Sequence, residues 1–366
     1  MAEARTDAAS IREALPPDGA ELVEIIMAIN EETEFLGTSE DRPPWAERPE
    51  QGLREMRGRG TGVYFVAIEA GRMIGFLGAF PGGFARTRGI VYVAHIGVRE
   101  ARRGRGVGFR LLEALEARAR ARRARRLELR VDVDNPSALA LYRRSGFEIE
   151  GRVPDAALIG DAWRDHYWMS RPLAAEREPR WVPLDLHPPA ERAPIAPLSI
   201  RAIEPGDAAR LQAWERAILR EAPVFTKEAS EVASVRQIQK EIADSAANPR
   251  HFVLGAFAGE PGRERMLGHA GAWFDPWSRS RHDGFTSVNV LREASGLGIG
   301  RRLWGEVEAW ARRHGARRLT GAVQAHNLRG LAFARAAGFR QEAVARNYVL
   351  IEGRSADRVR LGKLLA

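Results

Sequence analysis

The sequence predicts two tandem domains of mixed α/β class, and three observations support this prediction. The chain has 366 residues, 45% hydrophobic and 29% charged, which is globular composition and more length than the ~150 residues of a usual domain. One stretch is repeated, because residues 93–147 align without a gap with residues 285–339. Each copy also alternates strand-like and helix-like segments. We therefore expect domains at 1–173 and 198–366, joined by a proline-rich linker at 174–197.

The elements of the first copy follow from its hydrophobic pattern. Apolar runs at 63–68 and 73–80 lie on either side of Ala70-Gly71 and predict a hairpin. A third run at 90–98 leads through a glycine-rich turn into a helix, and a strand at 127–133 precedes a short helix at 137–144 that Gly146 ends. The longer helix is predicted from apolar residues at helical spacing: Leu111, Leu112, Leu115 and Ala119.

The repeat extends over whole domains. Ile11-Arg12 with Asp18 matches Ile200-Arg201 with Asp207, although at an offset of 189 instead of 192. In the later region the identical pairs include Gly104/Gly296, Gly106/Gly298, Gly108/Gly300, Asn135/Asn327, Gly146/Gly338 and Phe147/Phe339. The segments 160–169 and 353–361 also match, and we expect both to be closing strands of the fold.

Composition excludes several kinds of chemistry. The chain has no cysteine, so disulfides, thiolate metal sites and cysteine nucleophiles are excluded, and we expect no metal site. The sequence shows neither a targeting segment nor an apolar run long enough to span a membrane, which predicts a soluble cytoplasmic protein with no membrane partner. The net charge of +9 is rich in arginine interleaved with glutamate, and we favour compositional bias over a nucleic-acid surface.

The glycine-rich turn is a candidate anion site. Gly104, Gly106 and Gly108 lie between a buried strand and an amphipathic helix, where backbone N–H groups can converge on a phosphate. A turn that only allows close packing is the alternative. The dinucleotide fingerprint fails because Phe109 and Arg301 stand where its third glycine belongs, and no P-loop is present.

Arg103-x-x-Gly106-x-Gly108, followed by Asn135, Tyr142 and Gly146-Phe147, resembles the GCN5-related N-acetyltransferase (GNAT) superfamily. The resemblance covers nearly all of both halves and implies two splayed mixed sheets flanked by helices. It also implies acetyl-CoA as cofactor, with the pyrophosphate held by the turn Arg103, Gly104, Arg105, Gly106, Val107 and Gly108. Ile96 and Val98 would pair with the pantetheine arm, Asn135 would contact that arm, and Tyr142 would also contact the cofactor.

The resemblance assigns Tyr142 as the general acid that protonates the leaving thiolate, with packing as the alternative role. The chemistry agrees, because the oxyanion of the attacked thioester needs a fixed donor such as the Val98 amide and the thiolate needs a proton. His95 is the candidate general base. The alternatives are a purely structural role for this strand histidine, a water relay, or the acidic residues Glu31, Glu32 and Glu34.

The second copy keeps the turn but differs at the expected site. Ser295, Ser287 and Ala334 replace Arg103, His95 and Tyr142, and Tyr348 or His326 could substitute for the lost groups. We expect weaker cofactor binding and a degenerate domain, with a second active domain as the alternative. Its expected cofactor contacts are Val288, Val290, Gly296, Leu297, Gly298, Ile299, Gly300 and Asn327.

Together these inferences predict an acetyl-CoA-dependent N-acetyltransferase in which a small-molecule or peptide amine attacks directly in a ternary complex. A non-catalytic tandem binding module is the alternative from a different class. Tyr142 in register with an intact Arg103 turn favours the enzyme, because a binding module needs no such acid.

Overall fold

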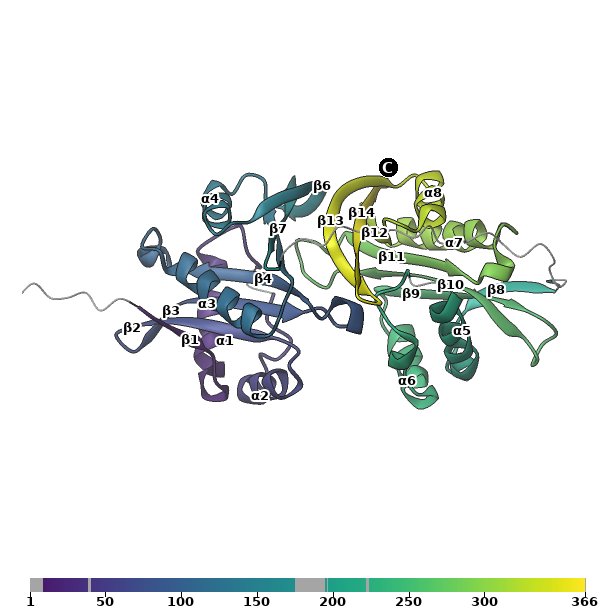
Figure 1. The fold of residues 1–366 in the computed structure, drawn as a ribbon, viewed down its shortest axis with the longest axis horizontal. Helices are drawn as coiled ribbons and strands as arrows, with labels where there is room; N and C mark the ends of the chain where they lie inside the picture. The colour runs from purple at the N-terminus through teal and green to yellow at the C-terminus, as the bar shows by residue number, and fades with distance from the viewer. Residues whose placement is uncertain (1–8, 39–40, 175–194, 196, 222–223, 366) are drawn as a thin grey trace, which may run out of the picture. The chain divides into compact units, whose positions relative to one another are not determined.

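The computed structural model describes residues 9–38, 41–174, 195, 197–221 and 224–365, which fold into two compact units. The first unit is built mainly from the chain before the proline-rich segment, and the second mainly from the chain after it. The predicted linker at 174–197 lies mostly outside the described residues. Both units are mixed α/β, as the sequence predicts, and each has a sheet with helices on both faces (Figure 1).

The first unit contains a seven-stranded sheet in the order β1-β2-β3-β4-β5-β7-β6. Its neighbouring strands are antiparallel except for the parallel pair β4–β5. The strands are β1 (Ser10–Glu13), β2 (Val63–Glu69), β3 (Arg72–Pro81), β4 (Ile90–Val98), β5 (Arg126–Asp132), β6 (Glu148–Ile159) and β7 (Ala162–Pro172). The helices are α1 (Gly19–Glu31), α2 (Pro49–Arg59), α3 (Val107–Ala121) and α4 (Pro136–Arg144).

The second unit repeats this arrangement, with the strand order β8-β9-β10-β11-β12-β14-β13 and the parallel pair β11–β12. Its strands are β8 (Leu198–Ala202), β9 (His251–Ala258), β10 (Arg265–Phe274), β11 (Asp283–Val290), β12 (Arg318–Gln324), β13 (Arg340–Ile351) and β14 (Arg354–Leu364). Its helices are α5 (Ala208–Glu221), α6 (Val235–Ala246), α7 (Ile299–Arg313) and α8 (Leu328–Ala336). The matched segments that end each copy are the second strands of hairpins, β7 and β14.

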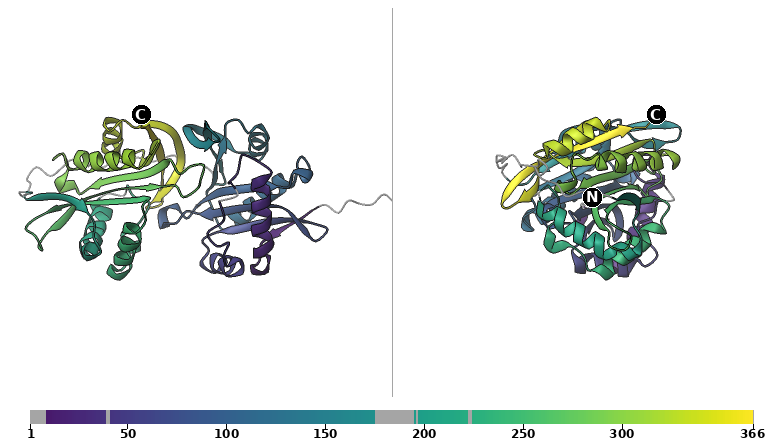
Figure 2. Two further views of the ribbon diagram at one scale, coloured as in Figure 1. Left: turned by 180° about the vertical axis from the view of Figure 1, so that it is seen from behind. Right: turned by 90° about the vertical axis from the view of Figure 1, so that its right-hand side faces the viewer.

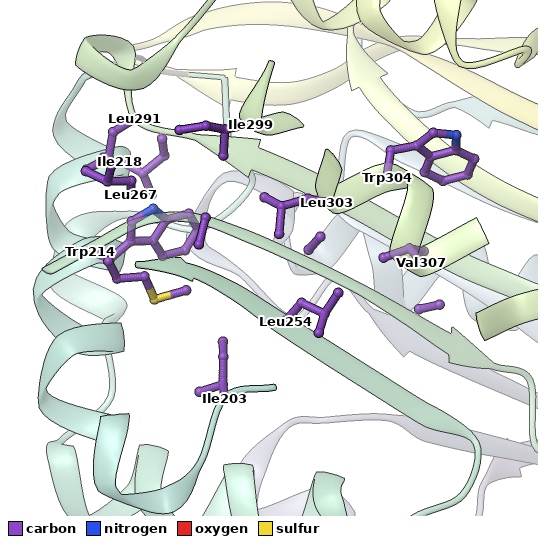
Figure 3. Close-up of a cluster of buried hydrophobic side chains, with 14 of the residues drawn as sticks. Ile203, Trp214, Ile218, Leu254, Leu267, Leu291, Ile299, Leu303, Trp304 and Val307 are labelled. Carbon is purple, nitrogen blue, oxygen red and sulfur yellow. The ribbon is translucent and has the colours of Figure 1, made fainter. Parts of the chain in front are cut away.

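Alternation along β2 divides the first unit's core between the two faces of the sheet. Val63 and Phe65 pack with α3, whereas Tyr64 and Val66 pack with α1 and α2. Viewed from behind, α1 lies against the strands (Figure 2). In the second unit, the labelled Trp214 and Ile218 of α5 and Leu303 and Val307 of α7 belong to one buried cluster (Figure 3). Burial of such side chains contributes ~1.5–3 kcal/mol each.

The repeated Arg and Asp residues at the start of each copy form an ion pair. Arg12 lies 2.6 Å from Asp18, and Arg201 lies 2.6 Å from Asp207. Each carboxylate also accepts a backbone N–H three residues earlier, from Leu15 or Glu204, which closes a single 3₁₀ turn before the first helix. Both copies therefore keep the same Arg–Asp ion pair and 3₁₀ turn, which together orient the first strand relative to the first helix.

The two parallel strands of each unit pair only at their beginning. The last paired residues of β4 and β5 are Tyr92 and Glu128, and those of β11 and β12 are Phe285 and Thr320. Beyond these residues each strand continues without its parallel neighbour. We call the opening between them the splay, and it is the feature that positions the site in each unit.

Candidate active site

The glycine turn of the first unit presents backbone donors to open space. Gly104 and Gly106 have φ of 76° and 78°, and a Cβ added at either residue would meet no other atom within 4 Å. Gly106 is the N-cap of α3, whose first regular backbone bond runs from the Arg110 N–H to the Gly106 carbonyl. The N–H groups before Arg110 therefore remain available at the positive end of a 15-residue helix, which suits a phosphate group.

The side chain of Arg103 is held by the first unit itself. Its Nε donates to the Val98 carbonyl at 3.1 Å, and its Nη2 lies 3.3 Å from Glu32 Oε2. Glu32 also accepts the Glu100 N–H at 2.7 Å and an Arg99 guanidinium at 3.1 Å. Glu32 thus links the end of α1 to the turn, a positioning role that sequence reasoning missed. Arg105 is exposed at the same turn, and Val107 is buried beneath it.

Backbone direction places the polar groups of Ile96 and Val98 in the splay. The Arg99 N–H donates to the Ile74 carbonyl on the β3 side at 2.9 Å. Because successive residues of a strand alternate sides, Val98 and Ile96 direct their N–H and C=O groups away from β3, toward β5. In the second unit the Leu291 N–H donates to the Leu267 carbonyl, also at 2.9 Å. The N–H and C=O groups of Val290 and Val288 therefore point away from β10, toward β12.

Asn135 serves as a helix cap. Its Oδ1 accepts the Ala138 N–H at 3.0 Å and the Ser137 hydroxyl at 3.1 Å, which satisfies the first turn of α4. Asn327 caps α8 in the same way, accepting the Gly330 N–H at 2.9 Å. The repeated asparagine therefore has a structural function in both copies, in addition to its predicted contact with the cofactor arm.

Tyr142 lies on α4, 6% exposed, within the core that packs against α3. Its ring centroid is 5.8 Å from that of Phe147. Burial raises the pKa of the Tyr142 phenol well above its usual value, and the nearby Tyr92 and Asp132 raise it further. The phenol is therefore protonated at neutral pH, as a donor must be, and it is a weaker acid than a free tyrosine.

His95 lies on the α1 and α2 side of the sheet. Its Nε2 is 3.0 Å from the Tyr64 hydroxyl, and its ring contacts those of Phe76 and Phe80. Burial lowers the pKa of His95 to about 4, so the imidazole is neutral at pH 7 but weakly basic. Its counterpart in the second unit, Ser287, lines the cavity described next.

The second unit contains a cavity of about 810 Å³ along the splay and the glycine turn. The predicted contacts Val288, Val290, Gly296, Gly298, Gly300 and Asn327 line it, whereas Ile299 is buried in the core. Leu297 is 44% exposed, and Ser295 donates through its hydroxyl to the Leu291 carbonyl at 3.1 Å. Ala334 lines the cavity at the position that the Tyr142 ring fills in the first copy.

The side chains that line this cavity carry more positive than negative charge, which matters for the expected weak binding of acetyl-CoA by the second unit. The turn has lost two arginines, because Ser295 and Leu297 stand where the first copy has Arg103 and Arg105, but the cavity has cations at other positions where the first copy has none. Arg292, Arg301, Arg329 and Arg358 replace Glu100, Phe109, Ser137 and His166. Together with Lys363 they outnumber the lining carboxylates Glu221 and Glu308. This balance favours an anionic ligand.

Two splayed mixed sheets, each with a glycine turn at the start of a helix, define a tandem protein of the acyl-CoA-binding transferase class. The chain belongs to the acetyltransferase (GNAT) family, whose family model matches residues 25–147 and 212–339. Acetyltransferases of this family use acetyl-CoA. Among the described residues, no helix is both long and apolar enough to cross a membrane.

Two curated relatives carry the name L-methionine sulfoximine/L-methionine sulfone acetyltransferase, from Pseudomonas paraeruginosa strain PA7 and Pseudomonas aeruginosa strain PAO1. Each is 36% identical over 80 residues, which is 22% of this chain and 46% of the relative. The chain thus spans about half the length of the curated relatives it matches.

Solved structures with similarity include a GNAT-family acetyltransferase from Streptococcus pneumoniae, 29% identical, covering 45% of this chain and 99% of that chain with a TM-score of 0.43. Another is a phosphinothricin acetyltransferase from Sinorhizobium meliloti in complex with AcCoA. It is 28% identical and covers 46% of this chain and 89% of that chain, with a TM-score of 0.40.

Proposed function

We propose that the first unit is an N-acetyltransferase that moves an acetyl group from acetyl-CoA to a small-molecule or peptide amine. Three observations support this proposal: an open glycine turn, strand backbone at the splay without a parallel neighbour, and the protonated phenol of Tyr142 on α4, the helix that follows β5. A module that only binds would need the first two features but not the third.

The residues of the first unit fit the cofactor that the family uses. The N–H groups of Gly104, Gly106 and Gly108 and the start of α3 would hold the pyrophosphate, with Arg103 exchanging its contact to Glu32 for one to phosphate. Ile96 and Val98 would pair with the extended arm, and the Asn135 amide would contact it. When bound, acetyl-CoA supplies the acetyl group as a reactive thioester.

Two groups of the chain then act on the charges that form during transfer. The Val98 N–H, directed into the splay, stabilises the developing oxyanion. Tyr142 keeps its proton until negative charge grows on the leaving sulfur, which its raised pKa ensures, and then donates it. The deprotonation of the amine needs a third group, which the next subsection addresses.

For the second unit we propose cofactor binding without transfer. Its cavity has the turn, the strand backbone and an excess of cations, but Ala334 offers no proton to a leaving thiolate. A second active unit that uses Tyr348 or His326 as its acid is the alternative, and the experiment below distinguishes the two.

For the acceptor we propose the α-amino group of an amino-acid analogue, on the basis of the relatives' names. A screen would begin with L-methionine sulfoximine and continue to peptide amines. Release of free thiol from coenzyme A is a clean readout, because the protein has no cysteine to add a background.

Gly106→Glu and Gly298→Glu in the full chain test these assignments. Each places a carboxylate at one turn, where an added Cβ meets no atom within 4 Å, so it repels phosphate there. The φ values of 78° and 75° are nearly equal, so the backbone strain of a non-glycine residue is common to both variants. We expect Gly106→Glu to abolish turnover and one class of acetyl-CoA sites measured by calorimetry. Gly298→Glu should remove the other class and leave kcat within a few-fold of the parent.

The opposite result, with Gly298→Glu inactive and Gly106→Glu active at normal thermal stability, would show that the catalytic and supporting units are reversed. If both variants bind acetyl-CoA like the parent, the glycine turns are not the cofactor sites.

A further inference from the structure

A partly buried histidine and a buried aspartate face each other beside the splay of the first unit. Asp132 at the end of β5 lies directly opposite His166 on β7 in the strand register. The Asp132 Oδ1 and His166 Nε2 atoms are 3.2 Å apart, and the side chains are 9% and 15% exposed. Within the described part of the chain, His166 Nδ1 and Asp132 Oδ1 are both buried without a hydrogen-bond partner, so the approach of Asp132 to His166 is an ion-pair contact.

This pair and Tyr142 lie on opposite faces of β5. Arg130, two residues before Asp132 and therefore on its face, lies over the Trp168 ring, two residues from His166 on β7. Val131 points the other way and shares the α3-side core with Tyr142. The Asp132 charge nevertheless contributes to the raised pKa of Tyr142, so the two groups are within electrostatic reach.

The second copy gives an internal control for this arrangement. At the same register position, Gln324 of β12 lies opposite Arg358 of β14. Gln324, Arg358 and Ala334 all line the 810 Å³ cavity along the splay, which locates their counterparts Asp132, His166 and Tyr142 around the corresponding opening. The titratable pair and the phenol are therefore lost together in one copy and present together in the other.

We propose that His166 is the general base of the first unit, accepting a proton from the acceptor amine at Nδ1, and that Asp132 positions it through Nε2–H. This inference rests on the proposed acetyl transfer. A carboxylate oxygen 3.2 Å from Nε2 favours the Nε2–H tautomer, which leaves the lone pair on Nδ1.

During acetyl transfer His166 takes up one proton and Tyr142 gives one. The amine proton passes to His166 Nδ1, giving an imidazolium that faces the Asp132 carboxylate, while the amine nitrogen forms the new N–C bond. The C–S bond breaks with its electron pair on sulfur, and Tyr142 returns a proton to that sulfur. The proposed base and acid thus act from opposite faces of β5.

His95 fits this role less well. Its Nε2 is engaged by the Tyr64 hydroxyl, and its ring is surrounded by Phe76 and Phe80. Its pKa of about 4 makes it a weak proton acceptor for an ammonium group. We therefore expect His95→Asn to alter stability more than turnover.

The test measures kcat/KM of the parent and of His166→Asn with a series of amine acceptors of falling basicity. For strongly basic amines, which are protonated at assay pH, we expect a loss of ~10²- to 10⁴-fold. The loss should shrink below ~10-fold for weakly basic amines, because these are already neutral at assay pH and the N–H proton that they lose as the N–C bond forms is acidic enough to pass to water. His251→Asn, in the second unit, is the matched control. It should leave kcat/KM unchanged for both the strongly basic and the weakly basic amines.

A second measurement does not depend on turnover. Nitrogen-15 NMR of the histidine rings should show His166, assigned by its absence in His166→Asn, as the Nε2–H tautomer, and Asp132→Leu should weaken that preference. Calorimetry should show parental acetyl-CoA binding in His166→Asn, which excludes general misfolding. His166→Gln repeats the test if the asparagine variant is unstable.

The outcomes separate the two proposals. Turnover by the parent with an equal loss in His166→Asn for every amine, or an Nδ1–H tautomer in the parent, would overturn the role of His166 alone. Absence of turnover by the parent with every amine would overturn the proposed transfer, and the base role with it.

Discussion

At the scale of single residues, burial determines what the candidate groups can do. Tyr142 and His95 are both shielded from water, and burial shifts their pKa values in opposite directions because it disfavours the charged form of each. The phenol becomes a group that keeps its proton, and the imidazole becomes one that stays neutral. The same physical cause thus favours Tyr142 as a donor and disfavours His95 as a base.

Tyr142→Phe removes one hydroxyl and keeps the ring against Phe147. We expect kcat to fall by ~10²- to 10⁴-fold, as for the loss of a positioned proton donor, while the free energy of unfolding changes little. Steady-state kinetics and denaturant unfolding measure the two quantities. Tyr167→Phe, on the neighbouring strand β7, is the control, and equal kinetics for both variants would leave Tyr142 with a packing role only.

At the scale of elements, the short helices α4 and α8 depend on their asparagine caps. Asn135→Ala and Asn327→Ala should each lower the free energy of unfolding by ~0.5–2 kcal/mol, because each removes an oxygen that satisfies the first turn. Denaturant titration measures this loss.

The two cap variants also separate structure from function. If Asn135 contacts the cofactor arm in the active unit, only Asn135→Ala should raise the KM for acetyl-CoA in the transfer reaction. An equal KM in both variants, with the expected loss of stability, would limit Asn135 to capping.

At the scale of the whole molecule, two partly buried histidines make stability depend on pH. Burial lowers the pKa values of both His95 and His269 to about 4, from the value of 6.5 that is usual for histidine. Since the unfolded chain binds protons at these sites first, their contribution to stability is complete above about pH 6.5 and decreases as the pH falls toward 4.

Thermal unfolding at a series of pH values checks this expectation. The melting temperature should fall from pH 7 to pH 4, and His269→Gln should make the fall shallower by removing one titrating site. His251→Gln, which removes a histidine at the start of β9, is the control. A pH dependence unchanged in His269→Gln would show that this histidine is protonated equally in both states.

Much of the fold could be predicted because the sequence pattern of the first domain is repeated in the second. The junctions of strand and helix are marked in the sequence by the glycine turns, by changes in apolar spacing and by Asn135 and Asn327. The elements lie within a few residues of their predicted bounds. Ile96 and Val98 could also be predicted, since strand alternation alone sets the direction of their backbone groups.

The remaining parts of the site depend on contacts between distant segments. Glu32 reaches the turn from the end of α1, and His166 meets Asp132 only because β7 inserts between β5 and β6. One signal was present in the sequence: Asp132 and His166 change to Gln324 and Arg358 in the same copy in which Tyr142 becomes Ala334. Comparing the differences between the copies, and not only their identities, would have found the pair.

The splay also provides each unit with its own probe of ligand binding. The backbone amides of Ile96 and Val98, and of Val288 and Val290, lie beyond the paired part of the parallel strands, so we expect their hydrogens to exchange rapidly with deuterium in the free protein. A ligand that adds an extended arm to the strand would slow exchange at those amides. Peptides covering β4 and β11 differ in sequence, so mass spectrometry can report occupancy of the two units separately and without any acceptor.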